Sequence, residues 1–476
     1  MSKILMGIFA ALLLMWHSPV MAENVMLKVK APGKHKPIVV EENGYLYATP
    51  NILKIGAKWD VQVNGARVFA IVPVDKRQES VKVPLAVTLV NGKPFIDVSF
   101  YAEQAGLSYT LNEKKRSIDI KKKKEKAPKK GKEEIGKTRQ PPVLMMWDPD
   151  LRFEENAPFF TDSSVRRILC PTWGSYHFFD SGENLPDLEY LNTARRKGIE
   201  VMPLIHNDFD LPATLKLMHD RKAQAELQRK MTAYSEVYGL SGYSIDFENM
   251  EAADKFRFSD FISGLSGYMH PLDKQVSVDI TVYIETSPTW SMCYDRESLA
   301  RAADYEVVMG YDQTPAGSNL PGPNSSWDWL DRHIQILLRQ IPPDKLVLGL
   351  PLYTRIWETG EGKTRAKTLS MRFTPKMLKT KGIRVTWSGR DKQYIANWKS
   401  GSKAYQIWVE DAISLKEKAR LMEAYNLAGL AFWRYGFEMP GMYGQIEAVL
   451  SDKNAGDFVS TLRRKEKDDG KKGMSM

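Results

Sequence analysis

Cysteine and histidine are both scarce in this chain of 476 residues. The only two cysteines are Cys170 and Cys293, so a disulfide framework is excluded and at most one bridge can form. Cys170 lies within an apolar strand candidate and Cys293 lies in a Trp-Ser-Met-Cys-Tyr loop, and we expect two free thiols. The seven histidines show no metal-ligand spacing. The sequence therefore predicts no metal site and no other cofactor.

Apolar runs long enough to cross a membrane are also missing. A span needs roughly 20 apolar residues, and the run from Ile4 to Trp16 is shorter. A positively charged start at Lys3 and a small-residue cleavage site at Val20-Met-Ala22 flank this run, which is the pattern of a signal peptide. No cysteine follows the run, which argues against a lipid anchor. We expect residues 1–22 to be cleaved, no membrane span in the mature protein, and a secreted or cell-envelope location.

Hydrophobic residues make up 43% of the chain, enough for substantial cores, and the length predicts two or three domains. Lysine dominates residues 121–141, which cannot bury apolar surface and are therefore predicted to be a linker. This linker is either a solvated spacer or a contact for an anionic cell-envelope polymer. We attribute the net charge of +10 partly to the linker and partly to a disordered basic tail, residues 465–476. Nucleic acid is not an expected partner, because the chain has no base-reading motif.

Residues 36–120 contain an internal repeat. Asn43-Gly44-x-x-Tyr47-Ala48 recurs as Asn91-Gly92-x-x-Phe95-Ile96, and each copy precedes a helical stretch and a glycine with a nearby aromatic residue. Asn-Gly between apolar runs is a strong hairpin signal, so each copy is predicted to form a hairpin, a helix and a strand. The segment resembles the copper amine oxidase N-terminal-like domain of exported bacterial proteins. It has no redox cofactor motif, and the resemblance implies a structural or envelope-binding module.

Residues 142–464 alternate between strand-like and helix-like sequence without a long break. Eight strands followed by helices fit a (β/α)8 barrel, and periodicity alone leaves a doubly wound open sheet as the alternative. The eight strand candidates are Val143–Trp147, Arg167–Thr172, Ile199–Ile205, Gly242–Phe247, Gln275–Val282, Tyr305–Gly310, Lys345–Leu350 and Gly429–Trp433.

One stretch of this region, residues 238–250, alternates apolar residues with a polar set, Ser244, Asp246 and Glu248. Alternation with period two puts this polar set on one face of a strand. Two carboxylates on a buried face are costly unless they have partners. The alternation also fits an edge strand with one solvated face.

The spacing Ser241-x-x-Ser244-x-Asp246-x-Glu248 resembles the D-x-x-D-x-D-x-E signature of family-18 glycoside hydrolases, with the last two acids kept. The resemblance is to the bacterial branch that acts on peptidoglycan and spore cortex. Further motifs that match the family in order are Cys170-Pro-Thr-Trp173, Pro203-Leu-Ile-His-Asn207, Trp290-Ser-Met-Cys-Tyr-Asp-Arg296, Met309-Gly-Tyr311-Asp312-Gln313, Gly349-Leu-Pro-Leu-Tyr353-Thr-Arg355 and Gly429-Leu-Ala-Phe-Trp433. The resemblance implies an α/β fold, a (β/α)8 TIM barrel preceded by a small α+β domain.

The resemblance also implies the chemistry. In family 18 the substrate's own 2-acetamido oxygen is the nucleophile, so the protein supplies one acid and groups that orient the acetamido group. Glu248 is implied as the proton donor and later the base. Asp246 is implied to bind the acetamido N–H and to raise the pKa of Glu248, and Tyr311 to bind the acetamido carbonyl.

Six further positions are candidate substrate-binding residues. In the family's positions, Asp312 is implied to bind sugar hydroxyls and Trp433 to form an apolar floor under the sugar. The remaining candidates are Ser244, Trp173, Asn207 and Arg355, of which the last three fit a pocket lining or a structural role equally well.

We expect an exported retaining β-N-acetylglucosaminidase acting on an N-acetylhexosamine glycan, most readily peptidoglycan. A chitinase or chito-oligosaccharide hydrolase is the alternative within the same class. A non-catalytic glycan-binding barrel is the alternative outside it, because Ser244 replaces an acid of the signature. Between Trp357 and Tyr405 the seventh crossover is enlarged, and we expect a hairpin insertion with a shallow groove that admits peptide-bearing glycan.

Overall fold

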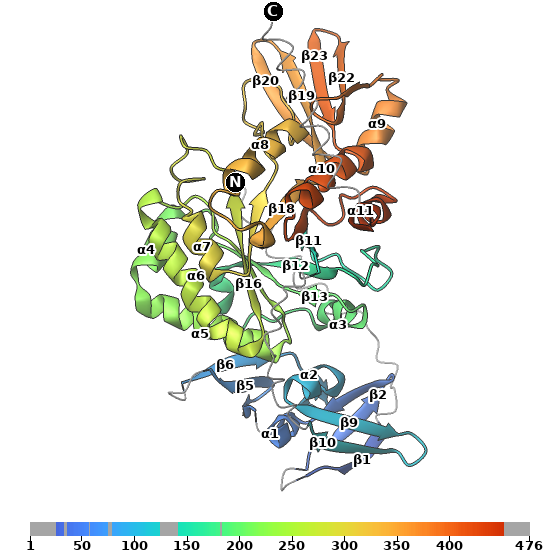
Figure 1. Ribbon diagram of the computed structural model, residues 1–476. Coiled ribbons are helices and arrows are strands. Elements are labelled where there is room, and N and C mark those ends of the chain that lie inside the picture. Colours follow the sequence, from blue (N-terminus) through green and yellow to red (C-terminus); the bar gives the residue numbers. More distant parts are fainter. Residues whose placement is uncertain are drawn as a thin grey trace, which may run out of the picture. The chain divides into compact units, whose positions relative to one another are not determined.

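The computed structural model describes residues 25–32, 36–56, 58–74, 79–123, 141–180 and 183–451 (Figure 1). The predicted signal peptide, most of the predicted linker and the predicted basic tail lie outside the described residues. The chain divides into two compact units, an N-terminal sheet-rich unit and a larger unit that holds the rest of the chain together with residues 79–83 of the N-terminal region. Among the described residues, no helix is both long enough and apolar enough to span a membrane.

The N-terminal region of the chain contains a seven-stranded sheet with the order β7-β8-β3-β2-β1-β10-β9 and a smaller sheet with the order β4-β5-β6. Its strands are β1 (Val25–Lys30), β2 (Val39–Glu42), β3 (Tyr45–Ala48), β4 (Asp60–Asn64), β5 (Arg67–Pro73), β6 (Ser80–Leu85), β7 (Thr88–Val90), β8 (Lys93–Asp97), β9 (Leu107–Asn112) and β10 (Ser117–Lys122). Its helices are the short 3-10 turn η1 (Pro50–Ile52), α1 (Leu53–Gly56) and α2 (Val98–Gln104).

The predicted repeat is confirmed. The hairpins β2–β3 and β7–β8 turn at Asn43-Gly44 and Asn91-Gly92, and all four of these residues have positive φ angles, between 51° and 81°. Two successive positive φ angles define the type I′ turn that suits a right-twisted hairpin. A helix and then a strand follow each hairpin, α1 with β4 and α2 with β9. The predicted bounds 36–120 are too narrow, because β1 pairs with both β2 and β10 inside the same sheet.

The larger unit contains a closed parallel barrel. Its strands follow the order β11-β24-β18-β17-β16-β15-β14-β12, and pairing between β11 and β12 closes the ring. The (β/α)8 prediction is therefore confirmed, and the open-sheet alternative is wrong. The strands are β11 (Val143–Asp148), β12 (Arg166–Ser175), β13 (Glu200–Val201), β14 (Leu204–His206), β15 (Gly242–Asp246), β16 (Gln275–Thr281), β17 (Tyr305–Met309), β18 (Leu346–Pro351) and β24 (Gly429–Trp433). The third strand is split into β13 and β14 around Pro203, which has no N–H to donate to a ladder.

Helices surround the barrel in the alternation that the sequence predicts (Figure 1). The α-helices are α3 (Leu188–Arg196), α4 (Leu211–His219), α5 (Arg221–Val237), α6 (Lys255–Met269), α7 (Arg296–Ala302), α8 (Trp327–Leu337), α10 (Ala412–Tyr425) and α11 (Met442–Ser451). The short 3-10 turns are η2 (Tyr176–Phe179), η3 (Ala252–Asp254), η4 (His270–Leu272) and η5 (Pro343–Lys345).

The barrel interior is filled by alternate residues of the strands. Val143, Met145 and Trp147 of β11 pack there with Ile168 and Cys170 of β12 and with inward residues of β14, β17, β18 and β24. Burying each aliphatic or aromatic side chain of this kind contributes about 1.5–3 kcal/mol. The same alternation, continued to the carboxyl ends of the strands, turns the polar residues of β15 inward. A (β/α)8 barrel places its site at that end.

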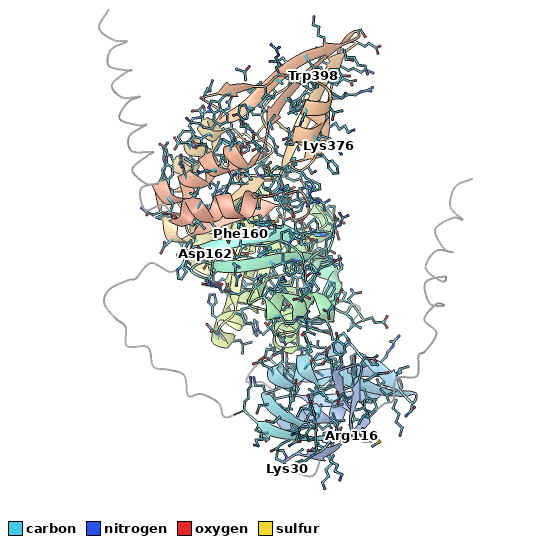
Figure 2. All side chains as sticks on the ribbon, turned by 90° about the vertical axis from the view of Figure 1, so that its right-hand side faces the viewer. Lys30, Arg116, Phe160, Asp162, Lys376 and Trp398 are labelled. Atoms are coloured by element: carbon cyan, nitrogen blue, oxygen red, sulfur yellow. The ribbon has the colours of Figure 1, made fainter. Side chains whose placement is uncertain are left out.

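The enlarged seventh crossover is a five-stranded antiparallel sheet with a helix, so the predicted hairpin is wrong, and the shallow groove inferred from it loses its basis. Its elements are β19 (Tyr353–Gly360), β20 (Lys363–Ser370), α9 (Thr374–Thr380), β21 (Thr386–Ser388), β22 (Gln393–Ser400) and β23 (Lys403–Val409). Leu378 of α9 packs on Ala396, Ile407 and Val409 of the sheet, which gives this α+β insertion a small core of its own. Figure 2 labels Lys376 on α9 and Trp398 on β22.

Much of the chain's positive charge lies in this α+β insertion. Residues 353–409 contain thirteen Lys or Arg and only three Asp or Glu. The attribution of the net charge to the linker and the tail is therefore incomplete, because a folded part of the chain contributes as well.

A fully buried ion pair joins the end of the α+β insertion to α10. The Lys418 Nζ lies 2.6 Å from each carboxylate oxygen of Glu410, and both side chains are 0% exposed. Gln393 Nε2 and Ser414 Oγ also donate to this carboxylate, at 2.7 and 3.1 Å. The pair is thus stabilised by hydrogen bonds that offset the cost of removing two charges from water.

We expect Lys418→Met to lower the free energy of unfolding by roughly 3–5 kcal/mol, because it leaves the Glu410 carboxylate buried without its cation. Chemical denaturation followed by circular dichroism measures the change. Lys416→Met, at a partly exposed position of the same helix, is the control and should change stability by less than about 1 kcal/mol. Equal effects of the two substitutions would show that the ion pair contributes nothing specific.

Candidate active site

The acidic residues of the signature lie together at the carboxyl end of β15. Asp246 is the last residue of the strand, and Glu248 follows two residues later. The Asp246 Oδ1 atom is buried and has no hydrogen-bond partner among the described residues. In the parallel register, Asp246 lies beside His206 of β14. Asp246 and Glu248 are therefore placed on the inner side of the barrel, as the alternation predicts, and not on a solvated edge strand.

Burial changes the acidity of both carboxyl groups. It raises the pKa of Asp246 to about 7. Burial also raises the pKa of Glu248 to about 9, with further contributions from the negative charges of Asp246 and Asp312. Desolvation disfavours the charged form of an acid, and a like charge nearby adds to the effect. Glu248 therefore holds its proton at neutral pH, as a general acid must.

Asn207 fixes the backbone that carries Glu248. Its Oδ1 accepts a hydrogen bond from the Glu248 main-chain N–H at 3.0 Å, and its Nδ2 donates to the Glu248 carbonyl at 2.7 Å. The same Nδ2 donates to Thr214 Oγ1 at 2.8 Å, and Asn207 is only 1% exposed. Its amide is fully engaged with protein groups. Asn207, predicted as a substrate ligand, is thus placed as a positioning residue for Glu248.

Asp312 is held by two side chains of β19. The Tyr353 hydroxyl donates a short hydrogen bond to Asp312 Oδ1, and the Arg355 guanidinium lies 2.8 Å from the same carboxylate. Arg355 is buried and also donates to Asn324 Oδ1 at 2.7 Å. The buried Arg355 side chain therefore orients the Asp312 carboxylate from the protein interior. The Asp312 carboxylate is half exposed and available to a ligand.

Two tryptophans close the end of the barrel. Trp433 at the end of β24 packs against the barrel core with Tyr311, and both are only partly exposed. The ring centroids of Trp433 and Trp147 lie 6.0 Å apart. Trp147, at the end of β11, was not among the predicted site residues. The signal that reveals it is the inward alternation of β11 itself.

Trp173 lies away from the carboxyl groups. Its ring stacks on Phe178 at 4.9 Å between centroids and meets the edge of Tyr243 at 6.5 Å. The Tyr243 hydroxyl donates to the main-chain oxygen of Met231 in α5, so this aromatic cluster belongs to the layer between the barrel and its helices. The structure does not bring Trp173 together with the other predicted site residues.

Ser244 contacts a carboxyl group that was not predicted as part of the site. Its hydroxyl donates to Asp279 Oδ1 of β16 at 3.1 Å, and both residues are buried. Burial raises the pKa of Asp279, and the negative charge of Asp246 raises it further. A single acid within an apolar strand gives only a weak signal in the sequence.

The other chemically reactive side chains lie outside this constellation or deep within the core. Cys170 and Cys293 are both free and buried, as predicted. Burial raises the pKa of the Cys293 thiol to about 11, which keeps it protonated and unreactive. Over the described ranges of the chain, no group of three or more His, Cys, Asp or Glu side chains could hold a metal ion.

Because Asn207 holds the Glu248 backbone in place, we expect Asn207→Ala to lower kcat by roughly 100-fold with little change in KM. A small displacement of a reacting group is costly. Asn207→Asp keeps the acceptor for the Glu248 N–H and should lose less. Steady-state kinetics on a soluble N-acetylglucosamine oligomer, with thermal unfolding as a check on folding, measure this. Wild-type kcat in a folded Asn207→Ala variant would contradict the positioning role.

Known bacterial proteins are similar to part of this chain. An uncharacterized glycosylase of Bacillus subtilis (strain 168), YvbX, is 24% identical over 291 residues, which cover 57% of this chain and 82% of the relative. The cortical fragment-lytic enzyme of the same organism is 22% identical over 244 residues, which cover 50% of this chain and 55% of the relative.

Solved structures share the barrel fold. A chitinase from Chromobacterium violaceum ATCC 12472 superposes with a TM-score of 0.57 at 18% identity, covering 66% of this chain and 100% of the other. The spore cortex-lytic enzyme SleL of Bacillus cereus gives a TM-score of 0.57 at 18% identity, covering 65% and 74%. Residues 155–438, more than half of the chain, match the model of glycosyl hydrolases family 18, and the chain belongs to this family of glycosidases.

Proposed function

We propose that this protein is an exported, retaining β-N-acetylglucosaminidase that cleaves peptidoglycan by substrate-assisted catalysis. One observation carries the proposal: Glu248 is a buried carboxyl group that keeps its proton at neutral pH and whose backbone is clamped by Asn207. Asp246 stands beside it with a buried oxygen free to accept a hydrogen bond. Substrate-assisted hydrolysis needs one such acid and one such helper.

In the first step, Glu248 donates its proton to the glycosidic oxygen, and the bond between that oxygen and the anomeric carbon breaks. The substrate's acetamido oxygen attacks the anomeric carbon and forms an oxazolinium ion. Asp246 accepts the acetamido N–H, and the Tyr311 hydroxyl donates to the acetamido carbonyl oxygen as it attacks. These contacts strengthen as charge develops in the transition state.

In the second step, the Glu248 carboxylate takes a proton from water, whose oxygen attacks the anomeric carbon and opens the oxazolinium ring. Two inversions at this carbon give net retention of configuration. Around the sugar, Asp312 binds hydroxyl groups in the orientation that Arg355 and Tyr353 impose. Trp433 supplies the apolar floor on which the C–H face of the pyranose stacks.

Peptidoglycan is proposed as the substrate class because the curated relatives include cortical fragment-lytic enzymes. Chitin is the second candidate. The α+β insertion favours chitin as the substrate. The resemblance to family 18 implies that an insertion of this kind deepens the substrate groove of chitinases. A non-catalytic glycan-binding barrel is the least favoured, because the acid Glu248 is present and held in place.

Residues 1–22 are proposed to direct export, and the N-terminal unit is proposed to be a copper amine oxidase N-terminal-like module that contacts the envelope. The two hairpin repeats of that unit support the resemblance. The Lys-rich linker is proposed to add adhesion to an anionic envelope polymer through its charge.

Glu248→Gln should lower turnover by roughly 100- to 10,000-fold, because the amide keeps the shape of the side chain but has no proton to give. Mass spectrometry of products from purified peptidoglycan and from chitin oligomers measures the loss and identifies the substrate. Glu251→Gln, an exposed position three residues along, is the matched control and should keep wild-type turnover. Turnover by Glu248→Gln close to the control would remove Glu248 as the acid.

Substrate assistance predicts that replacing the acetamido group of the cleaved sugar by a hydroxyl group abolishes turnover. A thiazoline analogue of the oxazolinium ion should inhibit, because it presents the charge and shape of the intermediate. Asp246→Asn and Tyr311→Phe should weaken this inhibition more than they weaken the binding of N-acetylglucosamine. A trapped glycosyl ester on any Asp or Glu would instead indicate a two-carboxylate mechanism.

A further inference from the structure

A third carboxyl group, that of Asp279, lies inside the barrel next to the acid pair. Asp279 is 1% exposed, and its strand β16 runs alongside β15. A buried carboxylate needs a cation, hydrogen bonds or a proton of its own. No Lys or Arg side chain forms an ion pair with Asp279 in the described part of the chain. The group is therefore paired by something other than a cation.

The register of the two strands places Asp279 beside Asp246. Ser244 pairs with Ser277 and Ile245 with Val278, so the next step along the ladder sets Asp246 and Asp279 side by side on the inner face. The Ser244 hydroxyl donates to Asp279 Oδ1 at 3.1 Å, which leaves the second oxygen of Asp279 unoccupied by this bond. Asp246 Oδ1 is buried and lacks a donor among the described residues. A proton on Asp279 would provide that donor.

The surroundings favour a neutral Asp279. Burial raises its pKa first, and the charges of Asp246 and then Glu248 raise it further, whereas the Ser244 hydroxyl and the Trp147 side chain lower it. A proton on Asp279 satisfies both carboxyl groups, because Asp279 already accepts a hydrogen bond from Ser244 whereas the buried Asp246 Oδ1 lacks a donor among the described residues. The titratable groups that face this pair from the neighbouring strands and from the loops that follow them include Cys170, His206, Glu248, Tyr294 and Tyr311.

We propose that Asp279 is a positioning residue that, in its neutral form, donates its carboxyl proton in a hydrogen bond to Asp246 and keeps Asp246 anionic and oriented. Ser244 takes part by holding the other oxygen of Asp279. The acid that the signature lacks at position 244 is thereby supplied from the neighbouring strand. This role rests on the proposed function of Asp246 and Glu248.

The test compares Asp279→Ala with Asp279→Asn, using a fluorogenic N,N′-diacetylchitobioside and soluble peptidoglycan fragments as substrates. Asparagine keeps a donor for Asp246, so Asp279→Asn should retain most of the wild-type kcat. Alanine removes the donor, so Asp279→Ala should lower kcat by about 10- to 100-fold with KM nearly unchanged.

The pH profile separates this role from a merely structural one. Without the hydrogen bond that stabilises its charged form, Asp246 should have a higher pKa, and the acid limb of kcat/KM should move to higher pH in Asp279→Ala. Movement to lower pH would overturn the proposal, because it would show that Asp279 is charged and repels Asp246. An unchanged kcat and pH profile would overturn it as well.

Ser277→Ala is the matched control, since Ser277 lies on the same strand and the same face, one layer deeper, and should leave kcat and the pH profile unchanged. If Asp279→Ala does not fold, Asp279→Leu, which fills the space but also lacks a donor, decides. Movement of the acid limb of kcat/KM to higher pH supports the proposal, and an unchanged acid limb overturns it. Glu248→Gln is measured in the same assays. Its retained activity would overturn the proposed function itself, whereas wild-type behaviour of Asp279→Ala beside an inactive Glu248→Gln would overturn only the role of Asp279.

Discussion

Carboxyl groups buried at the open end of the barrel without a paired cation are the constraint on which the site depends. Arg355, a buried cation at this end, is committed to Asp312 and Asn324. The described residues provide no Lys or Arg in an ion pair with Asp246 or Glu248. Protons must therefore neutralise much of the negative charge of these carboxyl groups, because a buried carboxylate without a paired cation is too costly. A carboxyl group that holds its proton at neutral pH is the direct consequence, and it is what makes glycosidic bond cleavage accessible to this fold.

The same constraint explains the hydrogen bonds that surround the acids. Asn207 uses its whole amide to hold the loop of Glu248, and Tyr353 and Arg355 hold Asp312 in a backbone conformation with a φ of +59°. Asn207 follows β14, Asp312 follows β17, and Tyr353 and Arg355 both lie on β19, which follows β18. Only a closed parallel barrel brings those ends together, so the geometry of the site is set by strand register and not by any local segment.

Short-range pattern predicted the strands and the inner face of β15, whereas the choice of a barrel over an open sheet and the roles of the site residues came from the resemblance to family 18. Continuous apolar runs mark strands buried on both faces, and the alternation through Ser244, Asp246 and Glu248 marks the inner face. For Trp173 the sequence left a pocket lining and a structural role open, and the alternation favours the structural role, since inward Cys170 makes Thr172 the next inward residue. Asp279 was missed because its partner lies on another strand. The α+β insertion was misjudged because its Lys-rich strands are largely exposed and bury few apolar side chains.

The concentration of unpaired acids in the barrel sets stability and activity against each other. Functional sites of this kind lower the stability of the folded state, and interactions elsewhere in the fold must offset that loss. Neutral or apolar residues at positions 246, 248 and 279 would remove that cost and would give a more stable but catalytically inactive protein. A directed-evolution campaign that selected variants of this chain by expression or heat resistance alone would therefore enrich inactive barrels. Any such selection has to be coupled to bond cleavage.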